Sequence, residues 1–185
     1  QKLTELEPDA PENWCSFGEG WLAAGEPAQA ETAYNRAAEI DRAAQTLFFS
    51  RLADGLLRAG YPERATAVWE KCVAARSDEP FSWMGLGDGL IRLGKPDAAA
   101  EAYSRAADLR PLAAGGVWNR LGHCLTKGGL HAHAAAAFAK AVEAEPENPL
   151  YPLRLAESYA AQGRDDLAAD VLRRAAALKP SPHGR

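Results

Sequence analysis

"GLGDGLIRLGKPDAA", residues 85–99, decides the fold of this chain, because its second half, residues 91–99, recurs along the sequence. The variants are LAAGEPAQA at 22–30, LRAGYPERA at 57–65, TKGGLHAHA at 126–134 and AAQGRDDLA at 160–168. The glycines that these stretches share stand at positions 25, 60, 94, 129 and 163, at intervals of 35, 34, 35 and 34 residues. A constant period of this length predicts pairs of helices joined by a tight turn.

The glycine-rich first half of the same stretch has the composition of a phosphate-binding loop. Such a loop must follow a strand and open a helix, and the sequence around residue 85 shows no strand pattern. We therefore interpret Gly87 as a site of close helix packing and Gly94 as a turn residue. Gly89 is expected to weaken its helix locally, since glycine costs about 1 kcal/mol relative to alanine in a helix.

A repeat register makes the pattern testable along the whole chain. When repeats start at Pro11, Thr46, Pro80, Gly115 and Pro149, positions 8, 20 and 27 carry only glycine, alanine or cysteine, which lets the two helices cross closely. These residues are Gly18, Ala53, Gly87, Gly122, Ala156, Ala30, Ala65, Ala99, Ala134, Ala168, Ala37, Cys72, Ala106, Ala141 and Ala175. Large apolar residues fill positions 7, 11 and 24 and, in the first four repeats, position 4. Prolines at 111, 146 and 180 are expected to end the second helices.

With these residues the chain resembles the tetratricopeptide (TPR) repeat family over residues 11–180. The resemblance implies an all-α fold, an α-solenoid in a right-handed superhelix of five TPR helix pairs plus a partial N-terminal helix. The expected repeats are 11–45, 46–79, 80–114, 115–148 and 149–182, followed by a tail at 183–185. Residues 1–8 are expected to be the end of a preceding repeat's second helix. Pro152 replaces the usual aromatic residue of position 4, which a helix tolerates near its start.

Composition and charge exclude several classes of protein. The formal net charge of −4 argues against nucleic-acid binding, which usually needs a clustered basic face. No apolar run approaches the roughly 18 residues of a membrane span, and the first residues lack the pattern of a signal peptide. Because the sequence opens with Gln1, we expect a processed protein or a piece of a longer one. Three widely spaced cysteines favour a reducing, cytoplasmic location slightly and leave a periplasmic one open.

No catalytic, cofactor-binding or metal-binding residue is predicted. His131 and His133 are expected in the turn of the fourth repeat, but two histidines alone cannot close a metal site that needs three or four ligands. Cys72 occupies a small-residue packing position and is expected in the core. Cys15 is expected on the groove side and Cys124 near the aromatic side, and neither has a histidine base that the sequence can place beside it.

In the TPR family, positions 2, 5, 6, 9, 12 and 13 of the first helices line a concave groove that binds other proteins. The resemblance therefore implies a partner-binding groove in this chain. Its predicted residues are Leu47, Arg51, Asp54, Arg58, Phe81, Met84, Asp88, Ile91, Arg92, Asn119, Arg120, His123, Lys127 and Arg154. Cations at positions 6 and 13 flank acids at position 9, and an apolar strip includes Leu47, Phe81 and Met84. The charges either serve a ligand or pair internally, as Asp54–Arg58 and Asp88–Arg92 could at i,i+4 spacing.

The resemblance predicts a non-enzymatic scaffold that binds a protein or peptide of unknown identity in this groove. Neither the chaperone-tail clamp nor the asparagine ladder of other TPR proteins can be matched to its groove positions. The alternative is a docking arm of a larger enzyme or assembly factor whose catalytic domain lies outside this chain. Self-association through the array ends is also expected, since Leu167, Val171 and Leu178 have no following helix to cover them.

Overall fold

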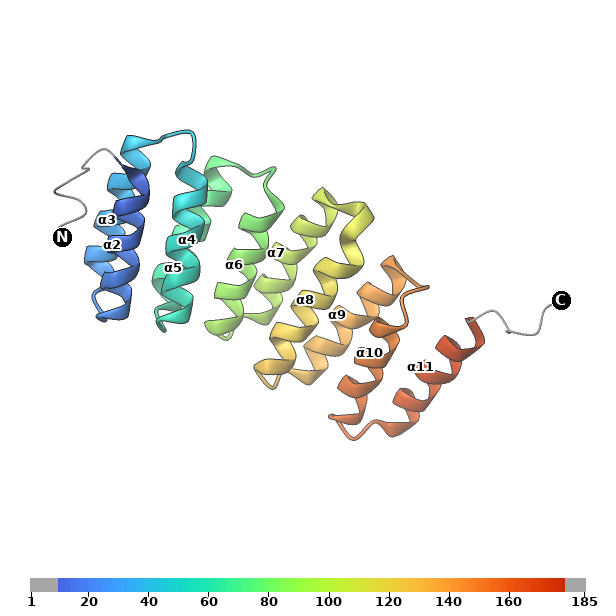
Figure 1. Cartoon of the computed structure of the whole chain (residues 1–185). Helices are drawn as coiled ribbons and strands as arrows, with labels where there is room; N and C mark the ends of the chain where they lie inside the picture. Colours follow the sequence, from blue (N-terminus) through green and yellow to red (C-terminus); the bar gives the residue numbers. More distant parts are fainter. Residues whose placement is uncertain (1–9, 179–185) are drawn as a thin grey trace. The chain divides into compact units, whose positions relative to one another are not determined.

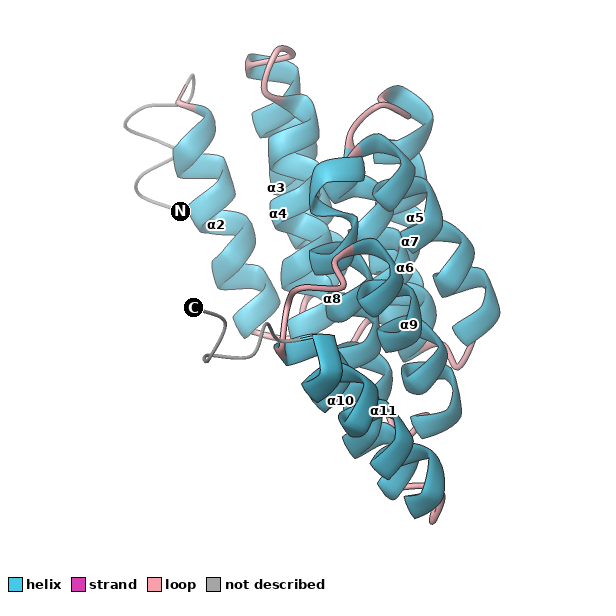
Figure 2. Cartoon of the chain, turned by 90° about the vertical axis from the view of Figure 1, so that its right-hand side faces the viewer, coloured by secondary structure: helices cyan, strands magenta, loops and turns pink. Residues whose placement is uncertain are grey.

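A computed structural model describes residues 10–178, and every regular element among them is a helix (Figure 2). The chain divides after Leu93 into two compact units, which we call unit 1 (residues 1–93) and unit 2 (residues 94–185). The helices of unit 1 are α2 Pro11–Ala23, α3 Pro27–Ile40, α4 Gln45–Arg58, α5 Pro62–Ala75 and α6 Pro80–Arg92. Those of unit 2 are α7 Pro96–Leu109, the 3-10 turn η1 Pro111–Ala113, α8 Ala114–Lys127, α9 His131–Ala144, α10 Leu150–Ala160 and α11 Asp165–Leu178.

The turn within each helix pair is set by its shared glycine. Gly25, Gly60, Gly94, Gly129 and Gly163 all have positive φ, a backbone region that other L-residues rarely adopt. In the first turn the Gly25 N–H donates to the Leu22 carbonyl at 3.1 Å, and the next N–H donates to the Trp21 carbonyl at 2.9 Å. This is the Schellman end of a helix. The turn role expected for Gly94 is confirmed by its φ of 70°.

Unit 1 packs each first helix against its second helix through glycines and alanines. Figure 1 shows α3 and α5 behind α2 and α4. Ala30, Tyr34 and Ala37 of α3 are fully buried, and a Cβ added to Gly18 of α2 would lie 2.6 Å from the Tyr34 ring. The first helices also touch one another, α2 with α4 and α4 with α6. They therefore form one layer, with the second helices behind it.

The glycines that opened the sequence analysis lie within α6. A Cβ added to Gly85 would collide with the Trp69 indole of α5, and one added to Gly89 would lie 2.5 Å from the Thr66 hydroxyl. Gly89 was expected only to weaken its helix, but the structure shows that the missing side chain lets Thr66 approach. Close packing on α6 therefore involves these two glycines as well as the buried Gly87.

Unit 2 has the same internal packing. A Cβ added to Gly122 of α8 would lie 2.6 Å from the Phe138 ring of α9, and Ala134 and Ala141 are fully buried. The Lys140 ammonium lies 4.1 Å from the centroid of the Trp118 ring, a cation–π contact between α9 and α8. Helix α10 begins at Leu150 and accommodates Pro152 in its first turn.

The expected all-α fold of successive helix pairs is thus confirmed for the described part of the chain. The segment expected as a preceding helix, residues 1–8, lies outside the described residues, as do Pro180 and the tail at 183–185. The predicted repeat bounds remain predictions. Among residues 10–178, no helix is long and apolar enough to span a lipid bilayer.

Candidate functional site

We call the surface of α2, α4 and α6 in unit 1, and that of α8 and α10 in unit 2, the first-helix face of each unit. Every predicted groove residue lies on these helices. Unit 1 carries Leu47, Arg51, Asp54, Arg58, Phe81, Met84, Asp88, Ile91 and Arg92. Unit 2 carries Asn119, Arg120, His123, Lys127 and Arg154.

Two apolar side chains of unit 1 are open to solvent. Leu47 is 56% exposed and Phe81 is 59% exposed, and they lie near the starts of the adjacent helices α4 and α6. Position 5 behaves differently, because Met84 is only 7% exposed and presents little surface to a ligand. Cys15, at the same position of the first repeat, was expected on the groove side and is instead fully buried in the core.

The charged centre of the unit 1 face is Arg51 of α4. Its guanidinium donates to the Glu12 carboxylate at 2.7 Å and to the Glu19 carboxylate at 3.0 Å, both on α2. The hydrogen bond to Glu12 is the main cause that raises the pKa of Arg51 further above its usual range. Both acids are well exposed, so we expect the pair to contribute at most about 1 kcal/mol. The contact joins two successive first helices.

Pairing along a single helix is found for Arg154 of α10, which binds Glu157 at 2.9 Å, three residues along its own helix. The expected pairs Asp54–Arg58 and Asp88–Arg92 remain predictions. Cations of this face therefore reach either across to the preceding first helix or along their own.

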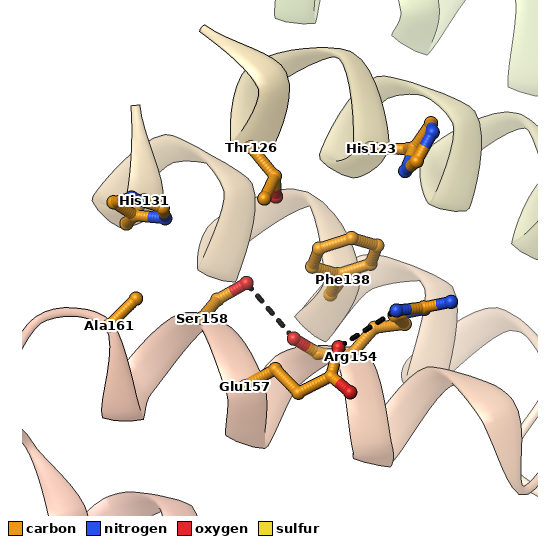
Figure 3. Close-up of a pocket in the computed structure, with 8 residues that line it drawn as sticks. All are labelled: His123, Thr126, His131, Phe138, Arg154, Glu157, Ser158 and Ala161. Atoms are coloured by element: carbon orange, nitrogen blue, oxygen red, sulfur yellow. Dashed lines mark hydrogen bonds and ion pairs between the residues drawn. The ribbon is translucent and has the colours of Figure 1, made fainter. Parts of the chain in front are cut away.

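The unit 2 face contains a small pocket between α8, α9 and α10 (Figure 3). Its lining residues are His123, Thr126, His131, Phe138, Arg154, Glu157, Ser158 and Ala161. Figure 3 shows His123 above the Arg154 guanidinium at one end, and His131 with Ala161 at the other. The cavity volume is about 80 Å³, well below the roughly 300–1,000 Å³ of sites for drug-sized ligands.

Hydrogen bonds inside the pocket leave only some polar groups available. The Thr126 hydroxyl donates to the Gly122 carbonyl and the Ser158 hydroxyl donates to the Arg154 carbonyl, both at 2.9 Å. The imidazole of His123 is exposed, and the Arg154 guanidinium binds the exposed Glu157 carboxylate at 2.9 Å. These side chains, together with the His131 ring, are what the pocket offers to a ligand.

Metal and thiol chemistry find little support in the described residues. His131 and His133 were expected in a turn but form the first turn of α9, and His133 lies 3.5 Å from Asp97. Within residues 10–178, no group of three or more metal-ligating side chains is found. Burial raises the pKa of both Cys15 and Cys72 to about 11, so both remain protonated thiols near neutral pH.

Sequence reasoning missed several residues of these sites. Glu12 and Glu19 belong to groove positions 2 and 9, but their joint contact with Arg51 depends on how closely α2 and α4 approach. His131, Phe138 and Ser158 of the pocket stand outside the groove positions. The signal that could have revealed them is the small side chains of the pocket rim, which leave second-helix residues visible from the first-helix face.

Comparison with known proteins agrees with this architecture. The profile of the tetratricopeptide repeat family matches residues 50–114, 84–149 and 119–182. The chain belongs to the tetratricopeptide repeat family. TPR repeats are the units of protein-interaction scaffolds. The comparison with curated proteins found no significant match.

Solved structures show the same fold at low identity. A crystal structure of MamA protein is 18% identical, with a TM-score of 0.61 over 96% of this chain and 100% of that one. MamA 41-end from Desulfovibrio magneticus RS-1 is 18% identical, with a TM-score of 0.61 over 95% and 98%. YrrB, described as a TPR protein with an unusual peptide-binding site, is 20% identical, with a TM-score of 0.56 over 98% and 92%.

Proposed function

We propose that this TPR chain is a non-enzymatic scaffold that binds a protein or peptide partner on its first-helix face. The observation that carries the proposal is the exposed apolar pair Leu47 and Phe81, on neighbouring first helices of unit 1. Large apolar side chains exposed on neighbouring helices often mark interaction sites, because burying them on a partner removes them from water. The likeness to YrrB, whose structure is described as having a peptide-binding site, also supports binding of a peptide partner.

Charges around this apolar pair favour recognition over catalysis. Arg51, Glu12 and Glu19 form a partly exposed network next to Leu47 on α4 and α2. Peripheral charges of this kind steer partners and set specificity, while apolar anchors hold the complex. Binding rather than bond chemistry is also consistent with the raised pKa of the buried thiols. A docking arm of a larger enzyme would use the same face, and the full-length gene distinguishes the two.

A peptide-display selection against the whole chain tests the proposal. Selected peptides are then measured by calorimetry against the wild type and the double variant Leu47→Ser/Phe81→Ser. Loss of two apolar anchors should weaken binding by at least about tenfold, since hot-spot truncations commonly exceed about 1 kcal/mol each. Because both side chains are exposed, the variant should keep its helical circular dichroism.

The chain offers a control for this experiment in Leu112. This leucine is 99% exposed but lies in η1, in a connection between repeats rather than on a first helix. Leu112→Ser should leave the affinity unchanged. If Leu112→Ser weakens binding and the Leu47/Phe81 variant does not, the partner uses another surface and the proposal is wrong.

A further inference from the structure

The described parts of the two units differ in net charge. Residues 10–93 contain 12 acidic and 8 basic side chains, whereas residues 94–178 contain ten of each. Unit 1 therefore has an excess of acids, and its electrostatic field attracts cations. The exposed apolar side chains Leu47 and Phe81 lie in this acidic unit. Charge can thus decide which apolar partner binds there.

Two acids that share one arginine border Leu47. Arg51 stands one helical turn after Leu47 on α4, and its guanidinium donates to both Glu12 and Glu19 of α2. We call these three charged side chains the Leu47 network. Two carboxylates and one guanidinium leave it with a net charge of −1. The Glu12 side chain is 65% exposed, so its carboxylate can accept further hydrogen bonds from a partner.

The same arrangement borders Phe81. The Arg76 guanidinium lies 3.9 Å from the Asp78 carboxylate and 3.7 Å from the Glu79 carboxylate, and we call these three side chains the Phe81 network. Phe81 is tied to it, because its backbone N–H donates to Glu79 at 3.5 Å. The net charge is again −1, and the Asp78 side chain is 76% exposed. Each exposed apolar residue therefore stands next to an excess carboxylate.

We propose that the Leu47–Phe81 surface binds a cationic partner segment, in which lysine or arginine side chains flank two apolar residues. The inference rests on the proposed function and names the class of partner that unit 1 selects. The apolar residues of the partner contact Leu47 and Phe81, and each flanking cation binds an exposed carboxylate of one network. The added cation makes each network neutral. Lysine and arginine also suit this surface because their apolar stems pack on apolar side chains while their charged heads reach the acids.

Other cations of this face oppose the partner little. Arg58 and Arg92 stand eleven residues after Leu47 and Phe81, at the other ends of α4 and α6. At 1.5 Å per helical residue they are about 16 Å away, roughly two Debye lengths at physiological salt. Arg42, in the connection before α4, follows Asp41 directly, so the two together add no net charge.

The test uses blocked peptides and the whole chain. The probe acetyl-KLGGLK-amide places two leucines about 10 Å apart when extended, which matches the spacing of neighbouring helices. Its analogues are the neutral acetyl-QLGGLQ-amide and the acidic acetyl-ELGGLE-amide. NMR titration follows the Leu47 methyl and Phe81 ring signals. At low salt the cationic peptide should bind about fivefold more tightly than the neutral one, and the acidic peptide more weakly still. In 1 M NaCl the difference should fall below about twofold.

Variants connect this preference to the two networks. Glu12→Gln/Asp78→Asn makes both networks neutral and should remove the preference for the cationic peptide. Arg51→Gln gives the Leu47 network a second excess charge and should increase the preference by about two- to threefold, an effect that a merely structural role would not produce. The control is Glu39→Gln, because Glu39 is an exposed acid of the second helix α3 that binds Arg36 at 2.9 Å. It should leave the preference unchanged. Circular dichroism confirms that each variant is folded.

Three results would overturn the inference. Equal affinities for the cationic and neutral peptides at low salt would show that the surface does not select cations. An unchanged preference in the Glu12→Gln/Asp78→Asn variant would place the cation elsewhere. The absence of any shift at Leu47 and Phe81 with every probe would show that this surface takes no such peptide. In each case the proposed function stands if peptides from the display selection still lose affinity in the Leu47→Ser/Phe81→Ser variant.

Discussion

Arg51 in unit 1 and Arg154 in unit 2 occupy the same position of the repeat but have different partners. Arg51 holds two acids of the preceding first helix at 2.7 and 3.0 Å, and Arg154 holds one acid of its own helix at 2.9 Å. The exchange of two residues, Glu12 for Gly116 and Glu19 for His123, accounts for the difference. Internal pairing is therefore a property of individual repeats, decided by the residues at positions 2 and 9.

The cores beneath these faces do not share the difference. Gly18 faces Tyr34 in unit 1 as Gly122 faces Phe138 in unit 2, and an added Cβ would meet either ring at 2.6 Å. The helix crossing is thus kept while the exposed face varies. A repeat protein can change what it recognises in this way without changing how it packs.

The largest effect is expected where the two cores are the same. Ala30→Leu and Ala134→Leu each add bulk at a fully buried crossing and should each lower the free energy of unfolding by about 3 kcal/mol. Urea denaturation followed by circular dichroism at 222 nm measures the loss. Ala136→Leu, at an exposed position of α9, should change stability little. A large loss of stability for only one of these two variants would show that the two helix crossings are not packed equally tightly.

A smaller effect is expected from alanine at the glycines that contact the rings. Gly18→Ala and Gly122→Ala should each destabilise by about 1–2 kcal/mol, because the gain in helix propensity is smaller than the cost of overpacking. Gly20 lies two residues from Gly18 in α2, and a Cβ added there meets nothing within 4 Å. Gly20→Ala should therefore stabilise by up to about 1 kcal/mol. Destabilisation by Gly20→Ala would contradict the packing explanation.

Removal of each arginine should lower the free energy of unfolding by a different amount in the two units. Arg51→Gln should cost about 0.5–1 kcal/mol, since it removes two contacts between helices, and Arg154→Gln less than about 0.5 kcal/mol. Chemical denaturation in urea at low salt and in 1 M NaCl measures both, and salt should reduce the Arg51 effect by screening. Equal losses at both salt concentrations would mean that packing of the arginine stems, and not charge, explains the cost.

The smallest expected change in stability sharpens the comparison most. His123→Glu places in unit 2 the acid that unit 1 has at position 9, within reach of Arg154. Stability should rise by at most about 0.5 kcal/mol, measured by urea denaturation at low salt. His123→Gln serves as the neutral control. A His123→Glu variant that is no more stable than His123→Gln would argue that the side chain at position 9 does not reach Arg154.

The repeat period predicted the fold because small residues and turn glycines are local requirements. Ala30, Ala134 and Gly94 each fulfil a role that depends only on their position within one helix pair. The faces were harder to predict, since the contact of Arg51 with Glu12 spans 39 residues and depends on how closely two repeats approach. Met84 was expected to be accessible for the same reason that Cys15 was, and both lie too deep between helices.

The pocket escaped prediction because it is made by what is missing. Ala161 brings little bulk, the Thr126 hydroxyl bonds to its own helix, and the second-helix residue His131 becomes part of the lining. A list of groove positions names the side chains that point outward. Such a list does not show where small side chains leave a cavity between the helices.

The cation–π contact of Trp118 has a consequence for spectroscopy. Four of the five tryptophans, at 14, 21, 69 and 83, belong to unit 1, and Trp118 of unit 2 lies under the Lys140 ammonium. Indole fluorescence therefore reports mainly on unit 1, while the Trp118→Phe variant makes the emission specific to it. Fluorescence and circular dichroism melting curves that diverge would then mean that the two units unfold in separate steps, as TPR arrays can when cooperativity is incomplete.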